Sequence, residues 1–212
     1  MLLFAHVGLT LGAAGLLKKA FANWPSSESS GASATRIDLD SKPSDSVHSS
    51  SEKPARAKKS IDWRLVILGS MLPDIIDKPL GTVLFSGTFS NGRIFAHTLL
   101  FSLILLLIGL YFYKRGKTGM LVVALCSMGH LVLDSMWRTT STLFWPLRGW
   151  EFPKYDLSDG VVSIWIEALQ TNPATFMPEI IGAIIIASLL VYLLKHRNML
   201  NFIKTGRISG AQ

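Results

Sequence analysis

The chain has 212 residues, of which 49% are hydrophobic, and its mean hydropathy is +0.38. This composition excludes an ordinary soluble domain with a solvated surface and predicts that most of the chain lies in lipid. The formal net charge is +7, but the basic residues fall in loops beside hydrophobic runs, which indicates positive-inside topology and no nucleic-acid partner. The single cysteine, Cys126, lies in an apolar run and is predicted to pack there.

The first apolar run, 2–17, is short and is followed by the basic pair Lys18 and Lys19. A secretory signal carries its positive charge before the apolar region, so we expect a retained helix with its N-terminus outside. Residues 24–60 are rich in serine and almost free of large apolar side chains. Such a segment buries too little surface to offset its ordering entropy, so we predict a disordered insert there.

Residues 64–85 resume the hydrophobic pattern, but prolines, aspartates, a lysine and a glycine interrupt it. We therefore predict a helix that is broken at Pro73–Asp77, with protein or water covering the irregular backbone. The runs 94–113 and 120–137 are each long enough to cross about 30 Å of hydrocarbon at about 1.5 Å per residue. Both are predicted to be full spans.

The stretch 138–178 is more polar and rich in aromatic residues, so we expect it to lie on the extracytoplasmic side or at the membrane interface. The run 180–194 then forms a last span. Basic clusters follow the first apolar run, the run 94–113 and the last run. They all lie on one side of the membrane if the chain crosses five times and ends in the cytoplasm. The predicted fold is all-α, a polytopic helical bundle of about five spans, forming a single domain over residues 1–212 in the cell membrane.

Six histidines and aspartates stand inside otherwise apolar segments. An ionisable side chain in a membrane-spanning segment costs at least a few kcal/mol and tends to face a partner or a wet cavity. The five-span topology brings all six to a similar depth near the extracytoplasmic face, although they come from four separate segments. These residues are His6, Asp74, Asp77, His97, His130 and Asp134. A shared metal ion is the simplest explanation for their grouping.

The spacing of these residues agrees with a common ligand set. Asp74 and Asp77 are three residues apart and His130 and Asp134 are four apart, so each pair shares a face if the backbone is helical. Imidazole mixed with carboxylate points to a transition metal, zinc first and manganese second. Six candidates exceed the needs of one tetrahedral zinc, which leaves two metals, or one carboxylate that supports a ligand or acts as a base.

A metal-bound water is a nucleophile at neutral pH, and two ions about 3.5–4 Å apart suit a phosphoester, so hydrolysis is the expected chemistry. Arg93 precedes His97 by four residues, one helical turn, and could hold a phosphate oxygen or brace a metal-binding carboxylate. We assign catalytic roles to Asp77 and Arg93 and expect Thr98 to supply a supporting hydroxyl.

The order of these motifs resembles that of a known family. The motifs are His6, Leu72–Asp77, Arg93 with His97 and Thr98, and His130–Asp134 followed by Phe144–Pro146. They resemble the prokaryotic membrane-bound metal-dependent hydrolases of the LexA-regulated inner-membrane type, which are distantly similar to zinc-dependent phospholipase C. The resemblance implies an all-helical membrane protein with a hydrolytic metal centre, and it carries the ligand role onto all six residues. The chain departs from the family at Gly92, where a histidine is common, and in a wider Asp-x-x-Asp spacing, which puts one ligand of a second metal in doubt.

We therefore expect a membrane hydrolase that cleaves a phosphoester in a lipid or lipid-linked substrate, with membrane lipids as its partners. Two other functions stay open: a transporter or ion-conducting protein whose Asp and His side chains carry protons or a cation, and an inactive membrane scaffold of the same fold. Structural roles are also open, since Asp74 and Asp77 could cap helices and His130 could hydrogen-bond to Asp134.

Overall fold

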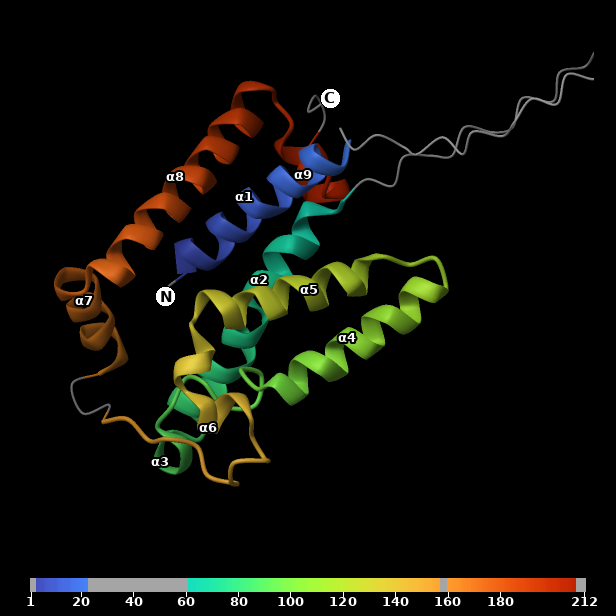
Figure 1. The fold of residues 1–212 in the computed structure, drawn as a ribbon. Coiled ribbons are helices and arrows are strands. Elements are labelled where there is room, and N and C mark those ends of the chain that lie inside the picture. The colour runs from blue at the N-terminus through green and yellow to red at the C-terminus, as the bar shows by residue number, and fades with distance from the viewer. Residues whose placement is uncertain (1–2, 23–60, 157–159, 209–212) are drawn as a thin grey trace, which may run out of the picture.

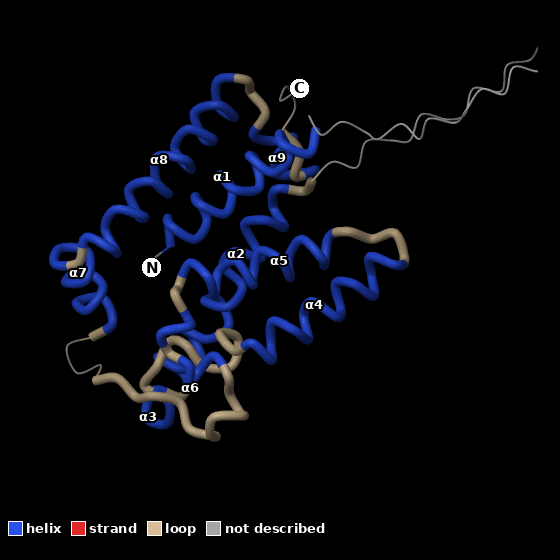
Figure 2. The backbone as a smooth tube through the Cα atoms, viewed as in Figure 1, coloured by secondary structure: helices blue, strands red, loops and turns tan. Residues whose placement is uncertain are grey.

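The computed structural model describes residues 3–22, 61–156 and 160–208, and this part of the chain is helical without strands (Figure 1, Figure 2). The all-α prediction is confirmed for these residues, whereas the insert predicted at 24–60 lies outside them. The longer helices are α1 (Leu3–Ala22), α2 (Trp63–Lys78), α4 (Leu99–Lys114), α5 (Gly119–Leu133) and α8 (Pro173–Lys195). The shorter ones are η1 (Pro79–Leu84), α3 (Ser86–Phe89), η2 (Met136–Arg138), α6 (Thr140–Leu143), α7 (Val161–Thr171) and α9 (Met199–Thr205).

The bundle is built on four helix pairs: α1 packs against α8 and against α2, and α5 packs between α2 and α4. Two small residues set the first contact, because a Cβ on Gly8 would overlap the backbone of Gly182. Close backbone approach through glycine is typical of helix association in membranes. Apolar side chains such as Leu11 and Val66 fill the space between α1 and α2, and Val123 is buried between α5 and α4.

One of the described helices, α8, is long and apolar enough to cross a membrane. α4 and α5 are apolar but have only 16 and 15 residues, so the five-span prediction is not confirmed. At about 1.5 Å per residue these two helices fall short of a hydrocarbon core of about 30 Å.

The apolar runs are longer than the helices that they form, because polar residues end the helices early. Thr98 has extended backbone (φ −91°, ψ 151°) and its Oγ1 accepts a hydrogen bond from the N–H of Phe101 at 3.1 Å, so α4 begins at Leu99 and not at residue 94. At the other helix, Asp134 caps the C-terminus of α5 and Ser135 follows in the left-handed region, with φ 53°. The length of each apolar run in the sequence therefore overestimates the length of the helix that it forms.

The predicted break at Pro73–Asp77 is wrong, because α2 continues without interruption to Lys78. Pro73 lies inside the helix although it has no N–H to donate, and such prolines are tolerated where neighbouring groups bond to the freed backbone. Pro73 frees the carbonyl of Gly69; the next carbonyl, that of Ser70, accepts a hydrogen bond from Nδ1 of His130 at 2.7 Å. The α-helical backbone ends only at Pro79, where the π-helical turns of η1 begin.

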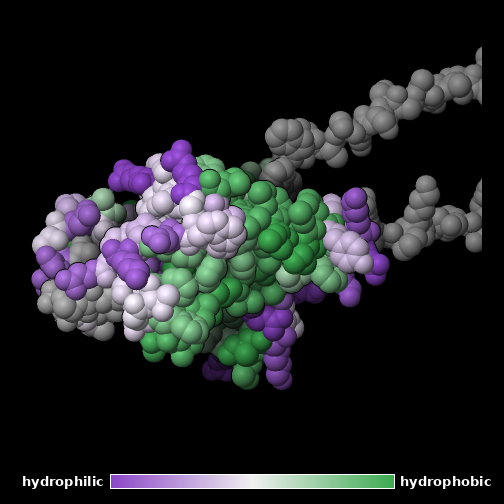
Figure 3. Space-filling model, turned by 90° about the horizontal axis from the view of Figure 1, so that it is seen from below, coloured by the Kyte–Doolittle hydropathy of each residue, from purple (hydrophilic) through white to green (hydrophobic). Residues whose placement is uncertain are grey.

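The two ends of the bundle differ in charge. The end of α1, the start of α2, the α4–α5 turn and α9 gather at one end of the molecule, while the starts of α1, α4 and α8 gather with the end of α2 at the other (Figure 1). Basic residues of the first end include Lys19, Arg64, Lys114, Arg115 and Lys204. Hydrophobic residues cover much of the surface between hydrophilic areas in the face that Figure 3 shows.

The α1–α8 contact can be tested with Gly182→Leu. A side chain at this position would meet the backbone of Phe4 and Ala5, so we expect destabilisation of roughly 1–3 kcal/mol, as in other overpacked sites. Thermal unfolding in detergent measures it. Gly129→Leu is the matched control, because that helical glycine has open space around it. Equal melting temperatures for the two variants would contradict a tight α1–α8 contact.

Candidate metal centre

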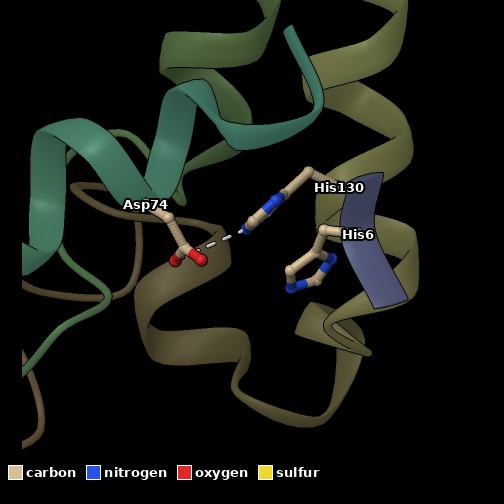
Figure 4. Close-up of side chains that lie close together, drawn as sticks. All are labelled: His6, Asp74 and His130. Carbon is tan, nitrogen blue, oxygen red and sulfur yellow. Dashed lines mark ion pairs between the residues drawn. The ribbon is translucent and has the colours of Figure 1, made fainter. Parts of the chain in front are cut away.

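Five of the six predicted residues converge at the end of the bundle opposite the basic end. They come from the first turn of α1, from α2, from the turn before α4 and from the end of α5, and their side chains are at most 4% exposed. These residues are His6, Asp74, His97, His130 and Asp134. Figure 4 shows His6, Asp74 and His130 pointing toward one another from three different helices.

Two overlapping groups of side chains have ligand atoms close enough to hold a metal ion, namely His6, Asp74 and His130, and His97, His130 and Asp134. Nε2 of His97 is 3.2 Å from Nε2 of His130. Oδ1 of Asp74 is 3.5 and 3.8 Å from these two nitrogens, and Oδ2 of Asp134 is 3.7 and 3.9 Å from them. Ligand atoms about 2.0–2.2 Å from a tetrahedral zinc lie about 3.3–3.6 Å from one another. The described residues therefore include a His/Asp cluster that could hold a metal ion.

The hydrogen bonds on the far side of each ring set its tautomer. Nδ1 of His130 lies 2.7 Å from the carbonyl oxygen of Ser70, which can only accept, so this nitrogen carries the proton. Nδ1 of His97 lies 2.7 Å from a carboxylate oxygen of Asp77 and carries its proton for the same reason. In the neutral rings both Nε2 atoms are then left with lone pairs that face the cluster.

Two lone pairs at 3.2 Å repel each other unless a cation lies between them. The cation is either a proton on one ring or a metal ion bound to both. Each ring already has a partner on its Nδ1, which is the arrangement that orients histidine ligands in metal sites. The donor set therefore fits a transition metal.

His6 borders the same cluster without a hydrogen bond of its own in the described part of the chain. The residue is fully buried, and neither ring nitrogen has a hydrogen-bond partner there. Its Nε2 lies 3.2 Å from Oδ1 of Asp134, and its ring stacks on His130 with centroids 3.9 Å apart. A buried imidazole is costly when it is unsatisfied, so a ligand role accounts for its position.

A glutamate of α8 holds this part of α1 in place. Oε2 of Glu179 accepts hydrogen bonds from the N–H groups of Phe4 and Ala5, at 2.9 and 3.2 Å. These are N–H groups at the start of a helix, which have no partner within the helix itself. Glu179 therefore fixes the turn that carries His6.

Two cations pair with the aspartates of the cluster. Nζ of Lys78 lies 2.7 Å from Oδ2 of Asp74, and Nε of Arg93 lies 2.7 Å from Oδ2 of Asp134. The helical turn predicted between Arg93 and His97 is absent, because residues 93–98 form a non-helical turn. The sequence left two roles open for Arg93, binding a phosphate oxygen or bracing a metal-binding carboxylate. Its contact with Asp134 favours the second role.

Asp77 occupies a different environment from the other five. Its carboxylate is fully buried and accepts hydrogen bonds from the N–H groups of Ile94, Ala96 and His97, at 2.7, 2.9 and 3.1 Å, as well as from the His97 ring. Both oxygens are engaged by these donors. This arrangement favours the supporting role that the sequence analysis left open, in which Asp77 orients His97 and holds the turn around it.

Aromatic side chains pack on the turn that carries His97. Phe95 makes edge-to-face contacts with Trp145 and Phe152, at centroid distances of 5.4 and 5.1 Å, and Trp145 stacks on Phe152 at 5.6 Å. The neighbouring Trp150 is 76% exposed. The aromatic stretch predicted at 138–178 thus contributes packing beside the site. Thr98 caps α4 and shows no contact with the cluster among the described hydrogen bonds.

Sequence reasoning missed three contributors to the centre. Lys78 and Glu179 carried a usable signal, since each is ionisable and stands beside or within an apolar run. Ser70 carried none, because it contributes a backbone carbonyl. Two other histidines stand outside the predicted set: His196 is exposed and packs against Tyr192, and His48 lies outside the described residues.

The comparisons with known proteins agree with a membrane location. No curated protein and no solved structure matches the chain. The family model described as YdjM inner membrane protein matches residues 1–199. The chain therefore belongs to the YdjM inner membrane protein family.

Proposed function

We propose that this protein is a membrane-bound metal-dependent hydrolase that cleaves a phosphoester in a lipid or lipid-linked substrate. One observation carries the proposal: two histidine Nε2 lone pairs face each other at 3.2 Å, with an oxygen from each of two aspartates beside them. The donor set, its burial and the resemblance to membrane-bound metal-dependent hydrolases support this function together.

His97, His130, Asp74 and Asp134 would hold the metal, for which zinc is our first choice and manganese our second. His6 would complete the site or contribute to a second ion. When bound, the metal supplies an activated water and polarises a phosphoryl oxygen.

The remaining groups of the centre position the ligands. Asp77 keeps Nε2 of His97 directed at the cluster, and the Ser70 carbonyl does the same for His130. Lys78 and Arg93 brace the carboxylates, and each has further N–H donors with which it can contact a phosphate oxygen.

For the topology, we propose a multi-pass protein with its N-terminus outside, its C-terminus in the cytoplasm and the site near the extracytoplasmic face. The separation of the site from the basic end of the bundle supports this orientation, because positive residues concentrate on the cytoplasmic side. The shorter apolar helices α4 and α5 could still traverse the membrane where it is thinned or where protein covers their ends.

A second candidate function is proton or cation transfer through the membrane. The same pair of Nε2 atoms favours it, since a shared proton would also relieve the lone-pair repulsion. A tightly bound transition metal would exclude the proton as the occupant of this position, so the metal content of the protein separates the two candidates.

Metal binding is tested by elemental analysis of the purified protein and its variants. We expect bound zinc or manganese in the wild type and loss of most of it in His130→Ala and Asp74→Ala, because each removes a ligand and leaves its neighbours unpaired. His196→Ala is the control, since that histidine is exposed and remote from the cluster. Equal metal in all four proteins would refute the metal centre.

The positioning role of Asp77 is tested with Asp77→Asn. An amide cannot accept the same set of N–H donors, so His97 should lose its fixed orientation and metal affinity should fall about 10–100-fold. Competition with a chelator measures the affinity, and the absorption spectrum of the cobalt-loaded protein reports the ligand geometry. Asp62→Asn, at the start of α2, is the matched control. Unchanged affinity and spectrum would mean that Asp77 only stabilises the fold.

Hydrolysis is tested by metal removal. Phosphate release from phosphatidic acid, or head-group release from a phosphodiester lipid, should stop after chelation and return when zinc or manganese is added back. The physical reason is that the nucleophile is a metal-activated water. If turnover persists in the chelated protein, or if the metal-loaded protein hydrolyses neither lipid class, the hydrolase proposal fails.

A further inference from the structure

An apolar cavity of about 690 Å³ lies between α1, α2, α7 and α8. Its volume is within the range of about 300–1,000 Å³ that is usual for small-molecule sites. Among the described residues that line it, three are ionisable, namely Asp74, Lys78 and Glu179. Much of its wall is formed by Leu3, Phe4, Met71, Ile75, Phe176 and Ile180.

The polar part of this cavity adjoins the candidate metal centre. Asp74 belongs to both: Oδ1 lies beside the histidine nitrogens, while Oδ2 pairs with Lys78 at 2.7 Å. Glu179 is engaged by the backbone of α1. Lys78 has three N–H donors, so it can keep its contact with Asp74 and also donate to a phosphate oxygen.

The apolar walls lie where lipid can reach them. Phe176 and Ile180 belong to α8, the helix long and apolar enough to span a membrane. Leu3, Ile75 and Ile180 are 50%, 53% and 40% exposed, so the cavity is open at its side and not enclosed in the core. A site with apolar walls that opens toward hydrocarbon favours a ligand that arrives from the bilayer.

We infer that this cavity binds the hydrocarbon chain of a phosphorylated lipid, with the phosphate at Lys78 beside the metal centre. The apolar walls match the chain, and the single lining cation matches the phosphate among the lining residues that the structure describes. The inference rests on the proposed function for the fate of the phosphate, whereas binding of the chain needs no hydrolysis. It narrows the substrate class to phosphoesters that carry a long apolar chain.

Photolabelling tests the chain site independently of turnover. The full-length protein is placed in vesicles that contain phosphatidic acid with a diazirine in its acyl chain, and a chelator is present throughout. Labelled peptides should come from α2 and α8 more than from the exposed apolar surface of α4. Ile180→Trp should lower the affinity of the cavity for the acyl chain about tenfold, and cavity labelling should fall by about the same factor.

Ile184→Trp is the matched control, because Ile184 is 60% exposed on the same helix and does not line the cavity. Its labelling should equal that of the wild type, and equal melting temperatures of the two variants verify that both are folded. Labelling spread evenly over α4 and α8, or unaffected by Ile180→Trp, would overturn the chain site.

A comparison of two lipids tests whether Lys78 binds the phosphate. Diacylglycerol with the same diazirine chain should label the cavity less than phosphatidic acid does, and Lys78→Gln should remove that difference. Equal labelling by the two lipids in the wild type would overturn the assignment to Lys78. If the cavity is labelled but the protein hydrolyses no substrate, the chain site stands and the hydrolase proposal fails. If the protein hydrolyses a short soluble phosphoester with its metal but the cavity is not labelled, the chain site is rejected and the hydrolase proposal stands.

Discussion

The buried carboxylate of Asp77 is the interaction on which the site depends. It accepts hydrogen bonds from three backbone N–H groups of the turn 94–97 and from the ring of His97. A buried charge is tolerated when several donors satisfy it, and here these donors belong to a segment that is not helical and would otherwise leave them unpaired. One side chain therefore ties α2 to the segment before α4, holds residues 94–97 in their non-helical turn and directs His97 at the cluster.

Charged side chains pair with one another across the centre. Lys78 pairs with Asp74 and Arg93 pairs with Asp134, while the Asp77 carboxylate accepts a hydrogen bond from the ring of His97. Buried ion pairs contribute little net stability, because desolvation offsets their attraction. A cation at the two Nε2 atoms would relieve their lone-pair repulsion. The polar core therefore fits a cation-binding role better than a purely stabilising one.

The sequence predicted the members of the cluster better than the shape of the helices. An ionisable residue in an apolar run is visible without a structure, and five such residues do converge. Helix ends were harder, because Thr98 and Asp134 cap helices inside apolar runs, and Pro73 lies within α2 although proline usually ends a helix. The Ser70 carbonyl has no side-chain signal at all. Glu179 was missed because the predicted last span began one residue after it.

The α1–α8 contact links the metal centre to the apolar cavity. Gly8 and Gly182 bring the two backbones together, and Glu179 then bonds to the N–H groups of Phe4 and Ala5. The same turn of α1 directs His6 at the cluster and contributes Phe4 to the cavity wall. A ligand seated in the cavity would therefore press on the turn that carries His6. Because a rigid contact with α8 supports that turn, the position of an apolar chain and the geometry of the cluster are set by the same few backbone atoms.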